Sequence, residues 1–133
     1  MRYLLMLMIL VGGLASCDRD EPELSPLDGA YEGTFDRSNP SVKFVESDVT
    51  LVLRDGKFSG KGSEFNYPAI GGGTYRLVGA DSVEFVNTTA WTTEFDATLI
   101  LSGRYHFLRE NDLLWLTRSL DTQSADTYRL EAQ

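Results

Sequence analysis

From Gly29 onward the chain consists of short segments in which apolar and polar residues alternate, and this period of two most restricts its fold. In residues 47–54, for example, Val49, Leu51 and Leu53 share one face, because successive side chains of a strand point to opposite sides. Turn residues such as Asp55-Gly56 separate the segments, and Asp-Gly favours a hairpin because both positions tolerate a positive φ. No segment keeps a period of 3.6 residues, so we predict an all-β protein.

Eight strands are predicted in this part of the chain. They span residues 31–35, 47–54, 57–64, 74–78, 82–87, 97–108, 113–118 and 127–132. Most of the connections are short, which favours an up-and-down antiparallel meander over the Greek-key order of a sandwich. An open sheet of this size exposes two edges, so we predict that residues 29–133 form a closed eight-stranded antiparallel barrel, a single domain.

The N-terminus has the pattern of a targeting signal. Arg2 precedes an unbroken apolar run over residues 3–11, and small residues follow it. A positive charge, an apolar stretch and small residues in this order are typical of a secretory signal peptide. The run is too short to cross a bilayer, which needs about 20 apolar residues. Residues 1–16 are therefore predicted to be a signal peptide.

Residues 14–17, with the sequence LASC, resemble the lipobox of bacterial lipoproteins, in which a peptidase cuts before a lipid-modified cysteine. The resemblance implies that Cys17 becomes the first residue and carries acyl chains such as palmitate; an ordinary free thiol is the alternative. Two or more acyl chains anchor a protein stably in a membrane. The resemblance thus implies a lipid anchor in the cell envelope of a Gram-negative bacterium, at the outer membrane, on its periplasmic face or at the cell surface.

Residues 18–28 contain five acids and two prolines, so they are predicted to be a flexible acidic tether between the anchor and the barrel. An acidic cluster after the lipidated cysteine resembles the surface-export signal of lipoproteins in some Gram-negative anaerobes. In enteric bacteria an aspartate at this place resembles an inner-membrane retention signal instead. The two resemblances point to different membranes, and the choice between them stays open.

Residues 27–34, with the sequence LDGAYEGT, resemble the start of calycin barrels, the lipocalin-like group. In that group a G-x-W motif opens the first strand, and an arginine near the last strand packs over the aromatic ring. This chain has tyrosine in place of tryptophan, as Gly29-x-Tyr31, and offers Arg118 or Arg129 as the arginine. The resemblance implies a lipocalin-like barrel on a small bacterial lipoprotein.

Alternation also predicts which side chains point into the barrel. They are almost all aromatic or aliphatic: Tyr31, Phe35, Val49, Leu51, Leu53, Phe58, Tyr75, Leu77, Val83, Phe85, Leu99, Leu101, Tyr105, Phe107, Leu114, Leu116, Tyr128 and Leu130. Strand 113–118 is ambiguous, because Leu113 and Trp115 make its other face apolar too.

Glycines on the inward face allow two interpretations. Gly33, Gly60, Gly62 and Gly103 have the same phase as the large inward residues. They could let the strands bend and the rings interdigitate in a filled barrel. Alternatively they could leave a cavity for a small apolar or amphiphilic ligand, since eight strands are just wide enough for one.

Two functions follow from these interpretations. A ligand-binding barrel would use the aromatic residues Tyr67, Tyr75, Phe85, Trp91, Tyr105 and Trp115. A filled barrel would instead be a protein- or glycan-interaction module, of which a protease inhibitor is one form. Tyr67 and Trp91 lie in predicted loops that a meander places at the same end of the barrel. An exposed tryptophan is a frequent binding anchor, and a tryptophan folded back over the barrel end is the alternative.

Composition argues against several other functions. With 20 Asp and Glu against 12 Lys and Arg, the net charge of −8 disfavours nucleic-acid binding, which needs clustered basic residues. One Cys and one His, His106 on an outward position, leave no Cys/His zinc site. A Ser-His-Asp triad would have to use this single histidine, and no G-x-S-x-G motif is present. Glu94 and Asp96 are the carboxylate pair in an aromatic loop, and loop acids are usually only solvated. We expect a monomer without enzymatic activity, metal or cofactor, which contacts a membrane through its anchor.

Overall fold

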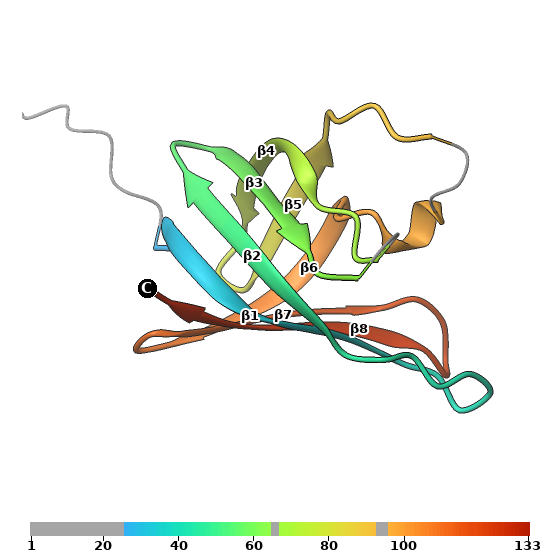
Figure 1. The fold of residues 1–133 in the computed structure, drawn as a ribbon. Coiled ribbons are helices and arrows are strands. Elements are labelled where there is room, and N and C mark those ends of the chain that lie inside the picture. Colours follow the sequence, from blue (N-terminus) through green and yellow to red (C-terminus); the bar gives the residue numbers. More distant parts are fainter. Residues whose placement is uncertain (1–25, 65–66, 93–95) are drawn as a thin grey trace, which may run out of the picture.

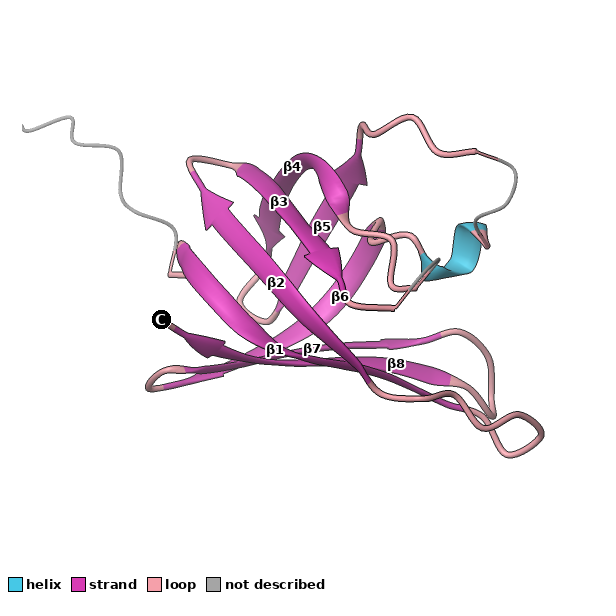
Figure 2. Cartoon of the chain, viewed as in Figure 1, coloured by secondary structure: helices cyan, strands magenta, loops and turns pink. Residues whose placement is uncertain are grey.

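Eight antiparallel strands follow one another around a closed barrel in the computed structural model, which describes residues 26–64, 67–92 and 96–133 (Figures 1 and 2). The predicted fold class is therefore confirmed. The predicted signal peptide 1–16, the predicted lipidation site Cys17 and residues 18–25 of the predicted tether lie outside the described residues. The strands are β1 (Gly29–Ser38), β2 (Ser47–Arg54), β3 (Lys57–Gly62), β4 (Gly71–Val78), β5 (Ser82–Asn87), β6 (Gly103–Glu110), β7 (Leu113–Ser119) and β8 (Ala125–Ala132).

The predicted sixth strand was wrong at its start. Ala97–Leu99 form a 3-10 helix, η1, and β6 begins only at Gly103. Asp96 ends the extended chain here, because its side chain accepts a hydrogen bond from the Thr98 amide at 2.8 Å and caps the helix. Smaller boundary errors occur where a neighbouring strand continues the ladder: β1 runs on to Ser38 opposite Ala125, and β4 starts at Gly71 opposite Gly60.

Glycines allow the barrel to close. A Cβ atom on Gly33 would lie 1.9 Å from the Arg129 carbonyl oxygen, and one on Gly60 would lie 2.1 Å from the Thr50 carbonyl oxygen. Both oxygens belong to the backbone of the neighbouring strand, so any side chain would push that strand away. At these two positions the structure supports the interpretation that inward glycines let the strands bend.

The inward face is the predicted one. All of the predicted inward residues are buried except Leu77 and Phe107, which are half-buried and pack against the core. In β7 the buried residues are Leu114 and Leu116, so Leu113 and Trp115 lie on the outer wall. This burial shows which face of β7 points into the barrel, which the sequence left ambiguous.

The two ends of the barrel differ. At one end, here called the turn end, tight turns join β2 to β3, β4 to β5 and β6 to β7, and the chain enters β1 there (Figure 1). At the other, the loop end, the longer connections 39–46, 63–70, 88–102 and 120–124 lie together. The loops that carry Tyr67 and Trp91 are both at the loop end, as predicted. An isolated bridge pairs Ala69 with Ile100 and joins the two loops directly.

Candidate functional site

Aromatic rings in contact with one another cross the inside of the barrel. The ring centroids of Phe58 and Phe85 lie 5.2 Å apart, those of Phe85 and Tyr105 5.7 Å, and those of Tyr105 and Tyr128 6.0 Å. Phe35 continues the series with its centroid 4.9 Å from that of Tyr128. These residues belong to β3, β5, β6, β8 and β1, so the contacts run from one wall to another. Such offset and edge-to-face pairs are the arrangements that aromatic rings favour in cores.

The turn end is closed by residues next to the entry of the chain. Leu27 is fully buried, and its carbonyl oxygen accepts a hydrogen bond of 2.7 Å from the Tyr31 hydroxyl. The Tyr75 hydroxyl donates to the carboxylate of Asp28. Arg109 covers Tyr31, with its guanidinium carbon 5.3 Å from the ring centroid and Nη1 donating to the hydroxyl oxygen. The segment before β1 is thereby held against the barrel.

The expected partner of Tyr31 was wrong. The resemblance to calycins offered Arg118 or Arg129, but Arg109 near the end of β6 packs on the ring. Tyr31 lies at the turn end of the barrel. Arg109 lies at the same end, beside the β6–β7 turn. Arg118 lies towards the loop end, where its guanidinium carbon is 4.6 Å from the centroid of Tyr105, and Arg129 is exposed on the outer wall.

Because three tyrosines are buried, we expect the free energy of unfolding to fall at alkaline pH. Burial raises the pKa of Tyr31, Tyr105 and Tyr128 above the ordinary value of 10.0. The unfolded chain therefore loses these protons first, so stability is fully present below pH 10 and falls as the pH rises above it. Each tyrosine is expected to lower the free energy of unfolding by up to about 1.4 kcal/mol per pH unit in that range. Urea titrations from about pH 8 to about pH 11 measure this slope, and it should be shallower in Tyr128→Phe. An unchanged slope would contradict the assignment.

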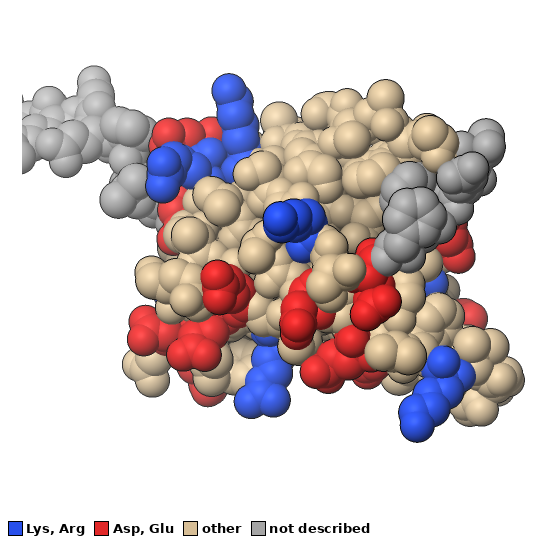
Figure 3. Space-filling model, viewed as in Figure 1, with Lys and Arg blue, Asp and Glu red and all other residues tan. Residues whose placement is uncertain are grey.

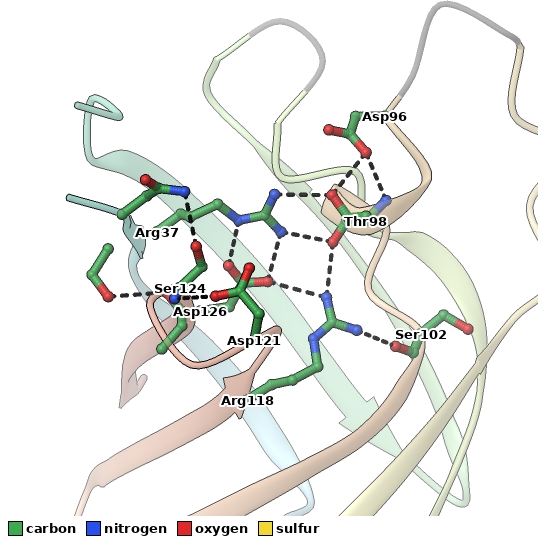
Figure 4. A network of polar contacts seen from close by, with 11 residues as sticks. Arg37, Asp96, Thr98, Ser102, Arg118, Asp121, Ser124 and Asp126 are labelled. Carbon is green, nitrogen blue, oxygen red and sulfur yellow. Dashed lines mark hydrogen bonds and ion pairs between the residues drawn. The ribbon is translucent and has the colours of Figure 1, made fainter. Parts of the chain in front are cut away.

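A buried ionic network lies at the loop end (Figure 4). Arg37 on β1 donates from Nε to Asp126 Oδ1 at 2.6 Å and from Nη2 to Oδ2 at 2.8 Å. Arg118 on β7 donates from Nη2 to the same Oδ2 at 3.1 Å. The Arg37 and Asp126 side chains are 6% and 1% exposed, so this pair is inside the protein. The hydrogen bond to Asp126 raises the pKa of Arg37 above its ordinary value.

The network also holds the β5–β6 loop (88–102). Arg37 Nη2 and Arg118 Nη2 each donate to the Thr98 carbonyl oxygen at 2.8 Å, and Arg118 Nη1 donates to the Ser102 carbonyl at 2.8 Å (Figure 4). Thr98 in turn donates its hydroxyl to Asp96 at 2.7 Å, and these bonds hold the pKa of the Asp96 carboxyl below its ordinary value. Asp96 is therefore a structural cap in this loop. Glu94, the other acid of the predicted pair, lies outside the described residues.

Sequence reasoning did not single out Arg37 and Asp126, although a signal existed. Both have the inward phase of their strands, since Arg37 follows Phe35 by two residues and Asp126 precedes Tyr128 by two. A charged residue at an inward position needs a partner, because an unpaired buried charge is costly. Opposite charges at inward positions of the first and last strands indicate such a pair.

Trp91 is folded back onto the barrel. Its Nε1 donates to Asn87 Oδ1 at 3.0 Å, and its ring packs so closely on Gly71 that a Cβ there would lie 2.7 Å from Cζ2. Asn87 Nδ2 donates to the carbonyls of Ile70 and Leu101 at 2.6 and 3.1 Å. Trp91 is half-buried in this arrangement, which agrees with the folded-back alternative.

The six aromatic candidates do not form one site. Tyr75, Phe85 and Tyr105 lie together in the core, with the ring centroids of Tyr75 and Phe85 6.3 Å apart, and the Tyr75 hydroxyl also contacts Asp28 at the turn end. Trp115 is on the outer wall, in register with Arg129. Trp91 and Tyr67 share the loop end but turn to different neighbours: Tyr67 packs on Phe35 and Phe44, with centroids 6.4 and 6.2 Å apart.

Exposed apolar side chains mark the β1–β2 loop (39–46). Val42 is 52% and Val45 65% exposed. Phe44 between them is half-buried, with Arg37 5.6 Å from its ring centroid and Tyr67 edge-on to it. Other exposed large apolar residues in the described part of the chain, Val86 and Leu108, lie apart from this loop on the outer wall.

Hydrogen bonds fix the conformation of the β1–β2 loop. The Tyr67 hydroxyl donates to the Val45 carbonyl at 2.6 Å. Asn39 accepts from the Ser41 amide at 2.8 Å and donates to the Ser124 hydroxyl at 2.8 Å. The exposed valines are thus presented by a loop that is tied to two other loops, which lowers the entropy cost of binding a partner.

Acidic side chains gather on the outer wall over β1, β2 and β8 (Figure 3). Glu32, Asp48 and Glu131 line an open hollow of about 640 Å³ there, together with Lys61. In the described ranges no group of three or more His, Cys, Asp or Glu residues is arranged to hold a metal ion. His106 is on the outer wall as predicted, 3.8 Å from the Asp81 carboxylate.

Comparison with known proteins adds no relative. No protein-family model matches the chain, and neither a curated protein nor a solved structure matches it. The eight-stranded antiparallel barrel is consistent with the calycin-like resemblance at the level of the fold. Of the residues that the structure describes, none form a helix long and apolar enough to cross a membrane.

Proposed function

We propose that this protein is a lipid-anchored lipoprotein of the Gram-negative cell envelope, held at the outer membrane through Cys17, which binds a protein partner at its loop end. The proposal assigns it no catalysis and no cofactor. The packing of the barrel supports it: contacting rings cross the interior, and hydrogen-bonded side chains lie at both ends. Binding is then a task for the outer surface, where Val42 and Val45 are exposed on a fixed loop.

The position of the chain entry supports this arrangement. Leu27 and Asp28 are held at the turn end, so an anchor that precedes them attaches the barrel to the membrane by that end. The β1–β2 loop is at the opposite end of the barrel. It would therefore point away from the membrane, where a partner in the periplasm or outside the cell has access to it.

The ligand-binding barrel remains a prediction, and it requires a rearrangement of the rings inside the barrel. A small apolar ligand would have to separate rings that now touch, such as Phe85 and Tyr105. Loss of such contacts costs free energy, which the ligand would have to supply. Native mass spectrometry of the full-length protein, gently extracted from its host, distinguishes the two functions. A lipid bound at near one-to-one would favour the ligand barrel, and the mass of the protein alone would favour the proposed surface.

Site-specific photo-crosslinking in living cells tests the surface itself. A benzoylphenylalanine in place of Val42 should give one saturable adduct, whereas the same group in place of Val86 should give none. Val86 is a matched control because its exposure, 51%, equals that of Val42 at 52%. Adding Val45→Asp to the Val42 probe should abolish the adduct. Equal adducts at both positions, or an adduct that is insensitive to Val45→Asp, would contradict the proposal.

A further inference from the structure

The loop end exposes an unpaired strand edge. The pairing of β1 with β2 stops at Phe35 and Ser47, whereas the pairing of β1 with β8 continues to Ser38 and Ala125. Residues 36–38 therefore have a strand on one side only. An unpaired edge presents free backbone amides and carbonyls to any chain that can align with it.

Residues 43–46 are the arm of the β1–β2 loop that leads into β2, and the contacts of this arm explain why the edge is open. Residues 43–46 would continue the β1–β2 ladder if they stayed next to β1. Instead the Phe44 ring packs against Tyr67, and the Val45 carbonyl accepts the Tyr67 hydroxyl. These contacts tie the arm to Tyr67 of the β3–β4 connection, and its backbone does not pair with residues 36–38, although the Phe44 ring still contacts the Arg37 side chain.

A hollow of about 690 Å³ lies beside the open edge. Its lining includes residues 36–38 of the open edge, residues 39–44 of the β1–β2 loop, and Gln123. Val42 and Phe44 give the lining apolar surface, and Val42 is half exposed. The hollow thus combines unpaired backbone with apolar side chains, which is the combination that binds extended peptides by strand addition.

We infer that an extended, basic segment of the protein partner adds to the free edge of β1 at residues 36–38 as a further strand. Its backbone pairs with the edge, and an apolar side chain enters the hollow against Val42. The inference rests on the proposed function and names the chemistry of the partner. It differs from the use of the barrel interior in a ligand barrel, because the partner pairs with the backbone edge of β1 and enters the hollow beside the β1–β2 loop.

The charges around the edge select a basic segment. Asp36, Glu46 and Asp48 are exposed on or next to the open edge, where Lys43 is also exposed. Arg37 lines the hollow too, but it is buried and its charge is paired with Asp126. The whole chain carries a net charge of −8. A segment in which Lys or Arg alternates with apolar residues matches both the pleat of a strand and this charge, and an acidic segment is repelled.

Peptide titration of the full-length protein in detergent micelles tests the inference by nuclear magnetic resonance. The probe is an eight-residue peptide of alternating lysine and valine. Controls are a glutamate–valine peptide and a lysine–valine peptide with N-methylated backbone on alternate residues. We expect the first peptide to shift the amide signals of residues 36–38 and 42–46. The acidic peptide should not bind, and N-methylation should weaken binding at least about tenfold, because it removes the donors of a strand ladder.

Charge variants separate edge binding from general attraction to an acidic protein. Glu46→Lys should weaken binding of the lysine–valine peptide by about three- to tenfold. Asp81→Lys, at the turn end and 70% exposed, makes the same charge change and should leave the affinity unchanged. Shifts scattered over the acidic wall of β1, β2 and β8, or equal binding of the N-methylated peptide, would overturn the inference. If the crosslink at position 42 still forms in that case, the proposed function stands without strand addition.

Discussion

Asp126→Ala is expected to lower the free energy of unfolding by about 3–5 kcal/mol, because it removes one partner of a buried ion pair and leaves a buried charge uncompensated. The carboxylate is the ionic partner of two arginines, since Arg37 binds it at 2.6 and 2.8 Å and Arg118 at 3.1 Å. Arg37 is 6% exposed, so without Asp126 its guanidinium is left in a buried position without its carboxylate partner. The same variant should also loosen η1, because both arginines hold the Thr98 carbonyl.

Urea unfolding of the full-length protein at neutral pH measures this loss. Glu84→Ala is the matched control: it removes a carboxylate that also pairs with two arginines, Arg76 at 3.0 Å and Arg104 at 3.7 Å. Those arginine side chains are 68% and 59% exposed, so the control should cost less than about 1 kcal/mol. If the two variants lowered the free energy of unfolding by similar amounts, burial would not be what makes the Asp126 network stabilising.

Gly33→Ala is the second substitution with a large expected effect, about 4 kcal/mol or more, which is exceptional for the addition of one methyl group. The new Cβ would lie 1.9 Å from the Arg129 carbonyl oxygen and 2.8 Å from the Leu130 Cα. These atoms are backbone of β8, so no side chain can turn aside to make room. Gly33 pairs with Leu130 where β1 meets β8, and this seam turns an open meander into a barrel.

Gly79→Ala tests whether crowding rather than the loss of glycine is responsible. Gly79 has a positive φ of 68°, but nothing lies within 4 Å of its Cβ position, so alanine should cost only about 1–2 kcal/mol. Amide hydrogen exchange gives a local measurement: in Gly33→Ala the amides of β1 and β8 should lose protection before those of β4 and β5. Two results would contradict the claim that crowding at the β1–β8 pairing destabilises Gly33→Ala. One is a uniform loss of amide protection, and the other is a decrease in the free energy of unfolding no larger than that of Gly79→Ala.

Local patterns were sufficient for the strands and their inward faces. Alternation in β2 and the Asp55-Gly56 turn predicted that hairpin correctly, since both signals act between near neighbours. The predicted strand over 97–108 failed only at its start, because one hydrogen bond, from the Thr98 amide to Asp96, favours a helical turn over an extended chain there. A period of two in the residues 97, 99 and 101 gave no sign of this competition.

The candidate site was predicted only in part. That the connections with Tyr67 and Trp91 share an end follows from a meander, and the Ala69–Ile100 bridge confirms it. The contacts of each ring did not follow from the sequence. Arg109 rather than Arg118 covers Tyr31, because the choice depends on which end of the barrel each side chain reaches.

By itself, the sequence determined the all-β class, the meander order and the apolar inward face, because these depend on the period of two and on turns between adjacent strands. Tertiary structure alone decided that rings from opposite walls touch inside the barrel, that Arg37 and Asp126 meet across the β1–β8 seam, and that residues 36–38 keep a free edge. Each of these features joins residues far apart in the chain. Their geometry depends on the closure of the barrel, which no local pattern encodes.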